Sequence, residues 1–226
     1  MDRRSNRLKD ENMDETAAIA RLKACGVIPV VVIEDASRAI DLAHALVAGG
    51  IDVVEVTLRR PAGLAALEAI AKSVPAALPV AGTVVTPAQV AQVRDAGAKA
   101  VVSPGFSESV DAALKEAGLP WLPGVATASD CMRAVAAGRT VAKFFPAETA
   151  GGPPALKALS GPFPQMSFCP TGGVGLANLS SYLALPQVIC VGGSWLVPAD
   201  AIASGDWKRV TQLAREAHDA FKALRG

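Results

Sequence analysis

Eight short runs rich in β-branched residues recur along the chain, and this repeat restricts the possible folds more than any other feature. Successive runs start about 20 to 27 residues apart, which is the length of one strand–helix unit. The stretches between them carry helix signals: Thr86-Pro87-Ala88-Gln89 is typical of a capping box with proline at the first helical position. The runs begin near Val27, Val53, Pro79, Ala100, Trp121, Thr140, Ser167 and Val188.

Eight strand–helix units in about 200 residues predict an α/β protein with the (β/α)8 fold, the TIM barrel, near the lower end of its size range. The alternative is a doubly wound open sheet, which would place a glycine-rich turn after the first strand. That strand is followed instead by Glu34-Asp35-Ala36-Ser37, so we favour the barrel. We expect one domain over residues 16–226, with a helix near Met13–Ala24 before the barrel and a closing helix over Trp207–Leu224. Residues 1–15 form a charged N-terminal extension, which we expect to be mobile and to which we assign no role.

Composition excludes several classes of partner. With 22 Lys+Arg against 21 Asp+Glu and only 4% aromatic residues, the chain offers neither the charge nor the stacking surface for nucleic acid. No segment approaches the roughly 18 apolar residues of a membrane span, and the N-terminus does not resemble a signal peptide. The four separated cysteines indicate reduced thiols in a cytoplasmic protein. The two histidines fall in predicted helices outside any ligand motif, so we expect no metal and no cofactor.

The second predicted strand carries polar residues on a face that should be dry. Side chains alternate along a strand, so the apolar residues of Val53–Arg59 lie mainly on one face, while Glu55, Thr57 and Arg59 share the other. A buried charge is costly unless it is paired, hydrated or bound to a ligand. These residues therefore form either a structural Glu55–Arg59 ion pair or part of a site.

The sixth strand repeats this anomaly at Lys143, which lies between apolar neighbours and shares a face with Val141 and Phe145. Burial disfavours a charged ammonium and lowers its pKa, which turns it into a nucleophilic amine. The alternative is a buried lysine that Glu55 merely neutralises. An amine, a carboxylate and an arginine in one cavity fit a Schiff-base enzyme for a 2-keto acid: the amine forms the imine, the carboxylate moves protons, and Arg59 binds the substrate carboxylate.

Two glycine motifs follow the last two strands. Thr171-Gly172-Gly173 comes after the seventh and Gly192-Gly193-Ser194 after the eighth. Barrels often bind phosphate at these loops, because exposed backbone N–H groups and helix N-termini attract anions. Ordinary turns would explain either motif alone, whereas the two together favour a phosphate site.

The motifs together resemble the 2-keto-3-deoxy-6-phosphogluconate (KDPG) aldolases, class I enzymes of the Entner–Doudoroff pathway, many of which also cleave 2-keto-4-hydroxyglutarate (KHG). The resemblance runs from about Ala17 to the C-terminus. It rests on EVTLR (Glu55–Arg59), AGTV (Ala81–Val84), SPG (Ser103–Gly105), KFFPAE (Lys143–Glu148), CPTGG (Cys169–Gly173) and GGSWLVP (Gly192–Pro198).

The resemblance implies a role for each matched position. It makes Lys143 the imine-forming lysine and Glu55 the proton carrier, and it places Arg59 and Thr83 at the substrate carboxylate. It also implies a homotrimer. Thr171, Gly172, Gly173, Gly193 and Ser194 would bind the polyol and phosphate end, and Pro104 and Phe145 would line the pocket.

We therefore expect a class I aldolase that splits KDPG into pyruvate and glyceraldehyde 3-phosphate. Within the class, the alternatives are an aldolase for KHG or for the galactonate epimer of KDPG. Outside it, a phosphosugar isomerase would use Glu55 as its base and Lys143 as an electrostatic clamp. A non-catalytic phosphate-binding barrel is a further alternative, which gives no reason to bury Lys143.

Overall fold

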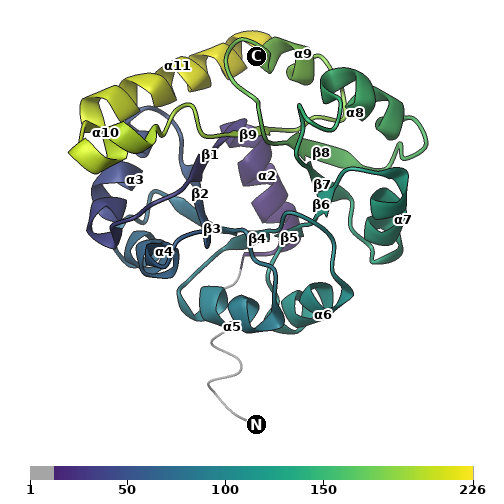
Figure 1. Ribbon diagram of the computed structural model, residues 1–226, viewed down its shortest axis with the longest axis horizontal. Helices are drawn as coiled ribbons and strands as arrows, with labels where there is room; N and C mark the ends of the chain where they lie inside the picture. The colour runs from purple at the N-terminus through teal and green to yellow at the C-terminus, as the bar shows by residue number, and fades with distance from the viewer. Residues whose placement is uncertain (1–12, 226) are drawn as a thin grey trace.

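The computed structural model describes residues 13–225, which form a ring of parallel strands surrounded by helices (Figure 1). Strands alternate with helices, as the repeat in the sequence predicts, except that β6 follows β5 directly. The strands are β1 (Val27–Val31), β2 (Val53–Thr57), β3 (Leu78–Gly82), β4 (Ala100–Val102), β5 (Trp121–Leu122), β6 (Gly124–Val125), β7 (Val141–Phe144), β8 (Ser167–Pro170) and β9 (Val191–Gly193).

The ring is closed by two parallel sheets that meet at both edges. One has the order β5-β4-β3-β2-β1-β9 and the other β6-β7-β8. Single bridges, Phe168 to Val188 and Thr171 to Gly192, connect β8 to the β9 segment. At the other junction β5 and β6 follow one another around Pro123, whose carbonyl accepts from the Lys143 backbone N–H at 2.8 Å. The predicted (β/α)8 barrel is confirmed.

Two strands differ from the prediction in detail. The fifth run is divided into β5 and β6, because Pro123 lies at its centre and has no backbone N–H to donate to a neighbouring strand. The eighth run begins near Val188, but its regular pairing is limited to Val191–Gly193.

The helices form the outer layer, except α2, which lies over the centre of the ring in this view (Figure 1). Thr86 caps its helix through the predicted capping box with Gln89, and Thr127 with Asp130 repeats that arrangement. The helical segments are α2 (Glu15–Cys25), η1 (Ala36–Arg38), α3 (Ala39–Ala48), α4 (Ala62–Ser73), α5 (Pro87–Asp95), α6 (Glu108–Ala117), α7 (Ala128–Ala136), α8 (Gly152–Ser160), α9 (Leu179–Leu183), α10 (Ala199–Ser204) and α11 (Trp207–Arg225).

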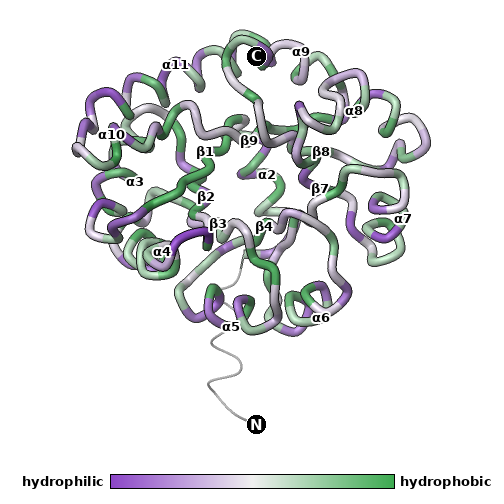
Figure 2. The backbone as a smooth tube through the Cα atoms, in the orientation of Figure 1, coloured by the Kyte–Doolittle hydropathy of each residue, from purple (hydrophilic) through white to green (hydrophobic). Residues whose placement is uncertain are grey.

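The apolar core follows the strands, while polar residues gather on the outer helices (Figure 2). Strands β1 and β2 are buried at every residue, as expected where a barrel interior lies on one face and helices cover the other. Buried polar side chains are therefore exceptions that need partners, and Glu55 and Lys143 are among them.

Helix α2 covers the end of the barrel where the strands begin. Arg21 of α2 pairs with Asp52, just before β2, at 2.7 Å. Glu15 of α2 accepts from Arg139, just before β7, at 3.2 Å. The N-terminal end of the barrel is thus closed, and the functional site must lie at the opposite end.

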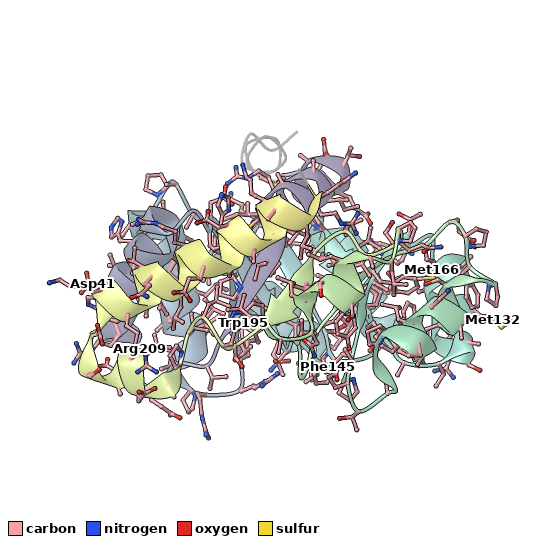
Figure 3. The ribbon with its side chains drawn as sticks, turned by 90° about the horizontal axis from the view of Figure 1, so that it is seen from above. Asp41, Met132, Phe145, Met166, Trp195 and Arg209 are labelled. Carbon is pink, nitrogen blue, oxygen red and sulfur yellow. The ribbon has the colours of Figure 1, made fainter. Side chains whose placement is uncertain are left out.

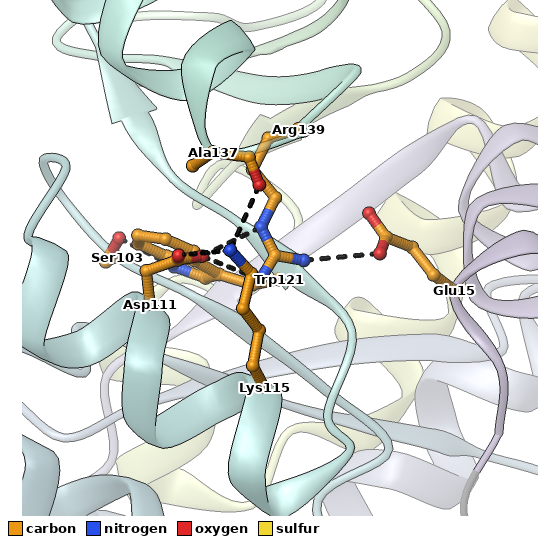
Figure 4. A network of polar contacts seen from close by, with 7 residues as sticks. All are labelled: Glu15, Ser103, Asp111, Lys115, Trp121, Ala137 and Arg139. Carbon is orange, nitrogen blue, oxygen red and sulfur yellow. Dashed lines mark hydrogen bonds and ion pairs between the residues drawn. The ribbon is translucent and has the colours of Figure 1, made fainter.

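Arg139 is the centre of a buried polar network at this closed end (Figure 4). Its Nε and Nη2 both donate to Oδ1 of Asp111, at 3.0 and 2.7 Å, and its guanidinium lies 5.5 Å from the centre of the Trp121 ring. Lys115 pairs with the other Asp111 oxygen at 2.7 Å. The network joins α2 and α6 to the residue that precedes β7 by two positions.

Within residues 13–225 no helix is long and apolar enough to cross a membrane, and no cluster of three metal-ligating side chains occurs. Of the predicted charged extension, Asp14 caps α2 and Glu15 lies in its first turn. Residues 1–12 lie outside the described part of the chain.

Candidate active site

A pocket of about 550 Å³ opens where the strands end. Ten of the eleven residues predicted for the site line it, and the eleventh, Glu55, contacts one of them. Figure 3 labels two of the lining residues, Phe145 and Trp195. The predicted residues on its wall are Arg59, Thr83, Pro104, Lys143, Phe145, Thr171, Gly172, Gly173, Gly193 and Ser194.

Lys143 and Glu55 form a buried ion pair at the base of this pocket. Nζ of Lys143, on β7, lies 3.2 Å from Oε1 of Glu55, on β2, and each residue is only 3% exposed. The ammonium also lies 5.2 Å from the centre of the Phe145 ring. Thr57, the other inward polar residue of β2, donates its hydroxyl to the Val31 carbonyl at 2.8 Å. The pocket therefore presents an amine in contact with a carboxylate.

Gly82 provides the space for the Glu55 carboxylate. A Cβ at position 82 would lie 2.7 Å from Cγ of Glu55, closer than real Cβ contacts allow. Because β2 and β3 are paired neighbours, a side chain at Gly82 would displace the carboxylate. The glycine of the AGTV motif is therefore needed for the position of Glu55 on the neighbouring strand.

Arg59 and Thr83 lie on the rim, beyond the ends of β2 and β3. Arg59 is exposed, and its Nε donates to Oγ1 of Thr83 at 3.4 Å. The alternative Glu55–Arg59 ion pair is absent among residues 13–225, where Glu55 pairs with Lys143 instead. Thr83 has a φ of 63°, which is strained for a β-branched residue and is typical of functional sites. The guanidinium and hydroxyl form a polar rim above the Lys143 amine.

The two glycine motifs meet on the other side of the pocket, as the bridge from Thr171 to Gly192 shows. A Cβ at Gly192 would lie 3.0 Å from Cγ2 of Thr171, so glycine allows the strands to approach. Gly172 and Gly173 have φ values of 99° and 80°, which glycine adopts readily. Within residues 13–225, the backbone N–H groups of residues 172–174, 194 and 195 have no protein acceptor. Such N–H groups are suited to an anion.

Four lining residues were missed by the sequence analysis: Val30, Val32, Val174 and Trp195. The valines gave no signal, because apolar residues occupy both faces of their strand or loop. Trp195 lies within the GGSWLVP motif, and its ring occupies the space above Gly193, where a Cβ would collide with it. The position of Trp195 directly after Gly193 and Ser194 in this motif was the sequence signal that could have identified the indole as part of the pocket wall.

The cysteines are free and buried, as the prediction of reduced thiols requires. Burial raises the pKa of Cys25 to about 12 and that of Cys131 to about 11. Cys169 differs, because a hydrogen bond from Cys190 lowers its pKa below the ordinary value in spite of burial, with help from the nearby Lys143 charge. Cys169 is paired in register with Lys143 and therefore belongs to the surroundings of the amine.

Comparisons with known proteins agree with the geometry. A family model described as aldolase, KDPG and KHG aldolase, matches residues 18–213. The KHG/KDPG aldolase of Escherichia coli K12 is 49% identical over 208 residues, covering 92% of this chain and 98% of the relative.

Two solved structures are also similar. A KDPG aldolase from Legionella pneumophila, with pyruvate captured at low pH as a covalent carbinolamine intermediate, superposes with a TM-score of 0.85 at 47% identity, covering 88% of this chain and 97% of that one. A KDPG aldolase of Zymomonas mobilis with 3-phosphoglycerate gives 0.83 at 44% identity, covering 89% and 93%. The similarity that the sequence motifs indicated is confirmed.

Proposed function

Because the chain belongs to the KDPG and KHG aldolase family, we propose that its pocket cleaves a 2-keto acid through an imine on Lys143. The protein is a class I aldolase, and KDPG, which yields pyruvate and glyceraldehyde 3-phosphate, is its substrate. The observation that carries the assignment of roles is the buried pair between Lys143 Nζ and Glu55 Oε1 at 3.2 Å. It lies at the base of a pocket whose anion-binding wall consists of the free N–H groups of residues 172–174, 194 and 195.

In the first stage, Lys143 gives its proton to Glu55 and the free amine attacks the C2 ketone. The C–N bond forms as the C=O π bond breaks, a proton moves from the nitrogen to the oxygen, and the product is a carbinolamine. Glu55 then returns a proton to this hydroxyl, which leaves as water, and a protonated imine remains. The short distance between the two groups supports this exchange, because general acid–base catalysis requires hydrogen-bond reach.

In the second stage, Glu55, directly or through a water molecule, takes the proton of the C4 hydroxyl. The C3–C4 bond breaks, and its electron pair moves into the imine to give an enamine while the aldehyde leaves. Protonation of the enamine at C3 and hydrolysis of the imine release pyruvate and restore Lys143. The imine thus serves as the electron sink that a free ketone could not provide efficiently.

The pocket walls orient the two ends of the substrate. Arg59 and Thr83 bind the keto-acid carboxylate, while the free N–H groups of residues 172–174 and 194–195, with the Ser194 hydroxyl, bind the phosphate. Pro104 and Phe145 line the space between. The anion-binding wall favours a phosphorylated substrate over KHG. The phosphosugar isomerase and the non-catalytic barrel are set aside, because the chain belongs to a family of aldolases.

Assembly and location are part of the proposal. The resemblance to the family implies a homotrimer, which the particle mass in solution would test. We place the enzyme in the cytoplasm, where four free buried thiols stay reduced.

Pyruvate release from KDPG, from its galactonate epimer and from KHG, measured side by side, tests the substrate. KDPG should give the highest kcat/KM. Faster release from the epimer or from KHG would reassign the enzyme within its class, and no release from any of the three would overturn the proposal.

A further inference from the structure

The loop with the free N–H groups of residues 172–174 is hydrogen-bonded to residues 147–148, in the turn that follows β7. The Ala147 N–H donates to the Thr171 carbonyl at 2.8 Å, and the Glu148 N–H donates to the Gly172 carbonyl at 3.0 Å. These two carbonyls thus bond to the turn. The N–H groups of residues 172–174, which line the pocket, have no protein acceptor within residues 13–225 and can bind a ligand. The conformation of this loop therefore depends on the turn.

That turn also carries a negative charge close to the loop. The Glu148 side chain packs against Gly173, where a Cβ would lie 2.5 Å from Cγ of Glu148. A carboxylate binds to the same backbone N–H groups as a phosphate, so a free Glu148 side chain would compete with the substrate. Its charge would also repel the phosphate across a short distance.

Tyr182 holds this carboxylate. Its hydroxyl, on α9, donates a hydrogen bond to Oε1 of Glu148, and Tyr182 itself is fully buried. Burial, together with the neighbouring Glu148 carboxylate, raises the pKa of the Tyr182 hydroxyl, so that it remains a donor throughout the neutral range. A rigid, buried donor therefore fixes an otherwise exposed carboxylate.

We propose that Tyr182 is a positioning residue for phosphate recognition, whose hydroxyl keeps the Glu148 carboxylate away from the N–H groups of residues 172–174. The inference rests on the proposed function, because it takes the phosphate of the substrate to lie against this loop. It assigns Tyr182 to substrate preference and leaves the imine chemistry at Lys143 untouched.

The test compares KDPG with KHG, which lacks the phosphate. Tyr182→Phe removes the hydroxyl and keeps the ring, so kcat/KM for KDPG should fall about tenfold, mainly through KM, while kcat/KM for KHG changes less than about twofold. Glu148→Gln alone should leave KDPG turnover near that of the wild type, since the neutral amide neither repels phosphate nor binds as an anion. The double variant should therefore recover most of the KDPG efficiency that Tyr182→Phe loses.

Ser160→Ala is the matched control. It also removes a buried hydroxyl, which donates to the Leu156 carbonyl at 2.7 Å on α8 and has no bond to the loop. It should change neither substrate preference nor KM.

Several outcomes separate the two proposals. Equal losses on KDPG and KHG in Tyr182→Phe, or no recovery in the double variant, would show that the tyrosine acts only in packing and would overturn this inference alone. A wild-type enzyme without any preference for KDPG over KHG would overturn both the phosphate site and the role of Tyr182.

Discussion

Replacing Glu55 with glutamine tests the assignment of the proton transfers most sharply. The carboxylate lies 3.2 Å from Lys143 Nζ at the base of the pocket, and glutamine keeps its shape and an oxygen that accepts from the ammonium. The variant loses the charge and the ability to carry a proton. Imine formation and C–C cleavage each need a proton transfer at this position, so both stages should slow.

The expected sizes follow from the burial of the pair. Loss of a general acid–base group lowers turnover by about 10²- to 10⁴-fold, which corresponds to roughly 3 to 5 kcal/mol of barrier. Breaking a buried ion pair from one side costs at most about 3–5 kcal/mol of unfolding free energy, because a buried charge is left uncompensated. The amide oxygen offsets part of that cost, so the fold should persist.

The assay is pyruvate release under saturating KDPG, combined with urea denaturation of the same samples. Glu68→Gln is the control, because it removes a carboxylate from an exposed ion pair with Lys72 on α4 and should change neither quantity. Turnover of Glu55→Gln within about threefold of the wild type would refute the reasoning and leave Glu55 as a structural partner of Lys143.

Three further predictions concern the walls and the closed end of the barrel. Ser194→Ala should reduce kcat/KM for KDPG about tenfold and leave that for KHG nearly unchanged, and equal losses would show that the hydroxyl does not bind phosphate. Gly82→Ala should abolish most aldolase activity while circular dichroism shows an intact fold, because the new Cβ displaces Glu55. Its control is Gly161→Ala, which should be active because the added Cβ makes only ordinary contacts. Arg139→Met should lower the unfolding free energy by about 1–3 kcal/mol in urea, since Asp111 loses both hydrogen bonds from Arg139 and keeps, among the described residues, only its pair with Lys115. Burial alone would raise the pKa of Asp111, but hydrogen bonds from Lys115 and Arg139 lower it below the ordinary value of 3.8. This carboxylate therefore contributes stability above about pH 4 that is lost as the pH falls through its folded pKa. The loss of unfolding free energy on the acid side should be smaller in Arg139→Met than in the wild type, and an unchanged loss would contradict this account.

The strand–helix repeat and the side-chain alternation were enough to predict the barrel and the meeting of Lys143 with Glu55. Both residues stand out because a charge on an inward strand face is expensive, so their positions alone indicated a partner. The division of the fifth strand was harder to foresee. Pro123 was visible, yet whether a proline merely ends a strand or lies between two halves depends on its neighbours in the sheet.

Other features could not be predicted because they depend on contacts between distant segments. The Tyr182–Glu148 hydrogen bond joins α9 to the turn after β7, and the Arg139 network joins α2 to α6; no local pattern marks either. Trp195 was overlooked because an aromatic residue after a Gly-Gly-Ser motif is most simply interpreted as core. The strained φ of Thr83 is set by the surrounding loop and leaves no trace in the residue type.

The central claim is that Lys143 forms the imine, and reductive trapping tests it most directly. The protein is incubated with pyruvate and sodium borohydride, digested, and mapped by mass spectrometry. One reduced pyruvyl adduct should appear, on the peptide that contains Lys143, and Lys143→Arg should give none. An unmodified wild-type protein, or an adduct on another lysine, would contradict the Schiff-base mechanism proposed for this pocket.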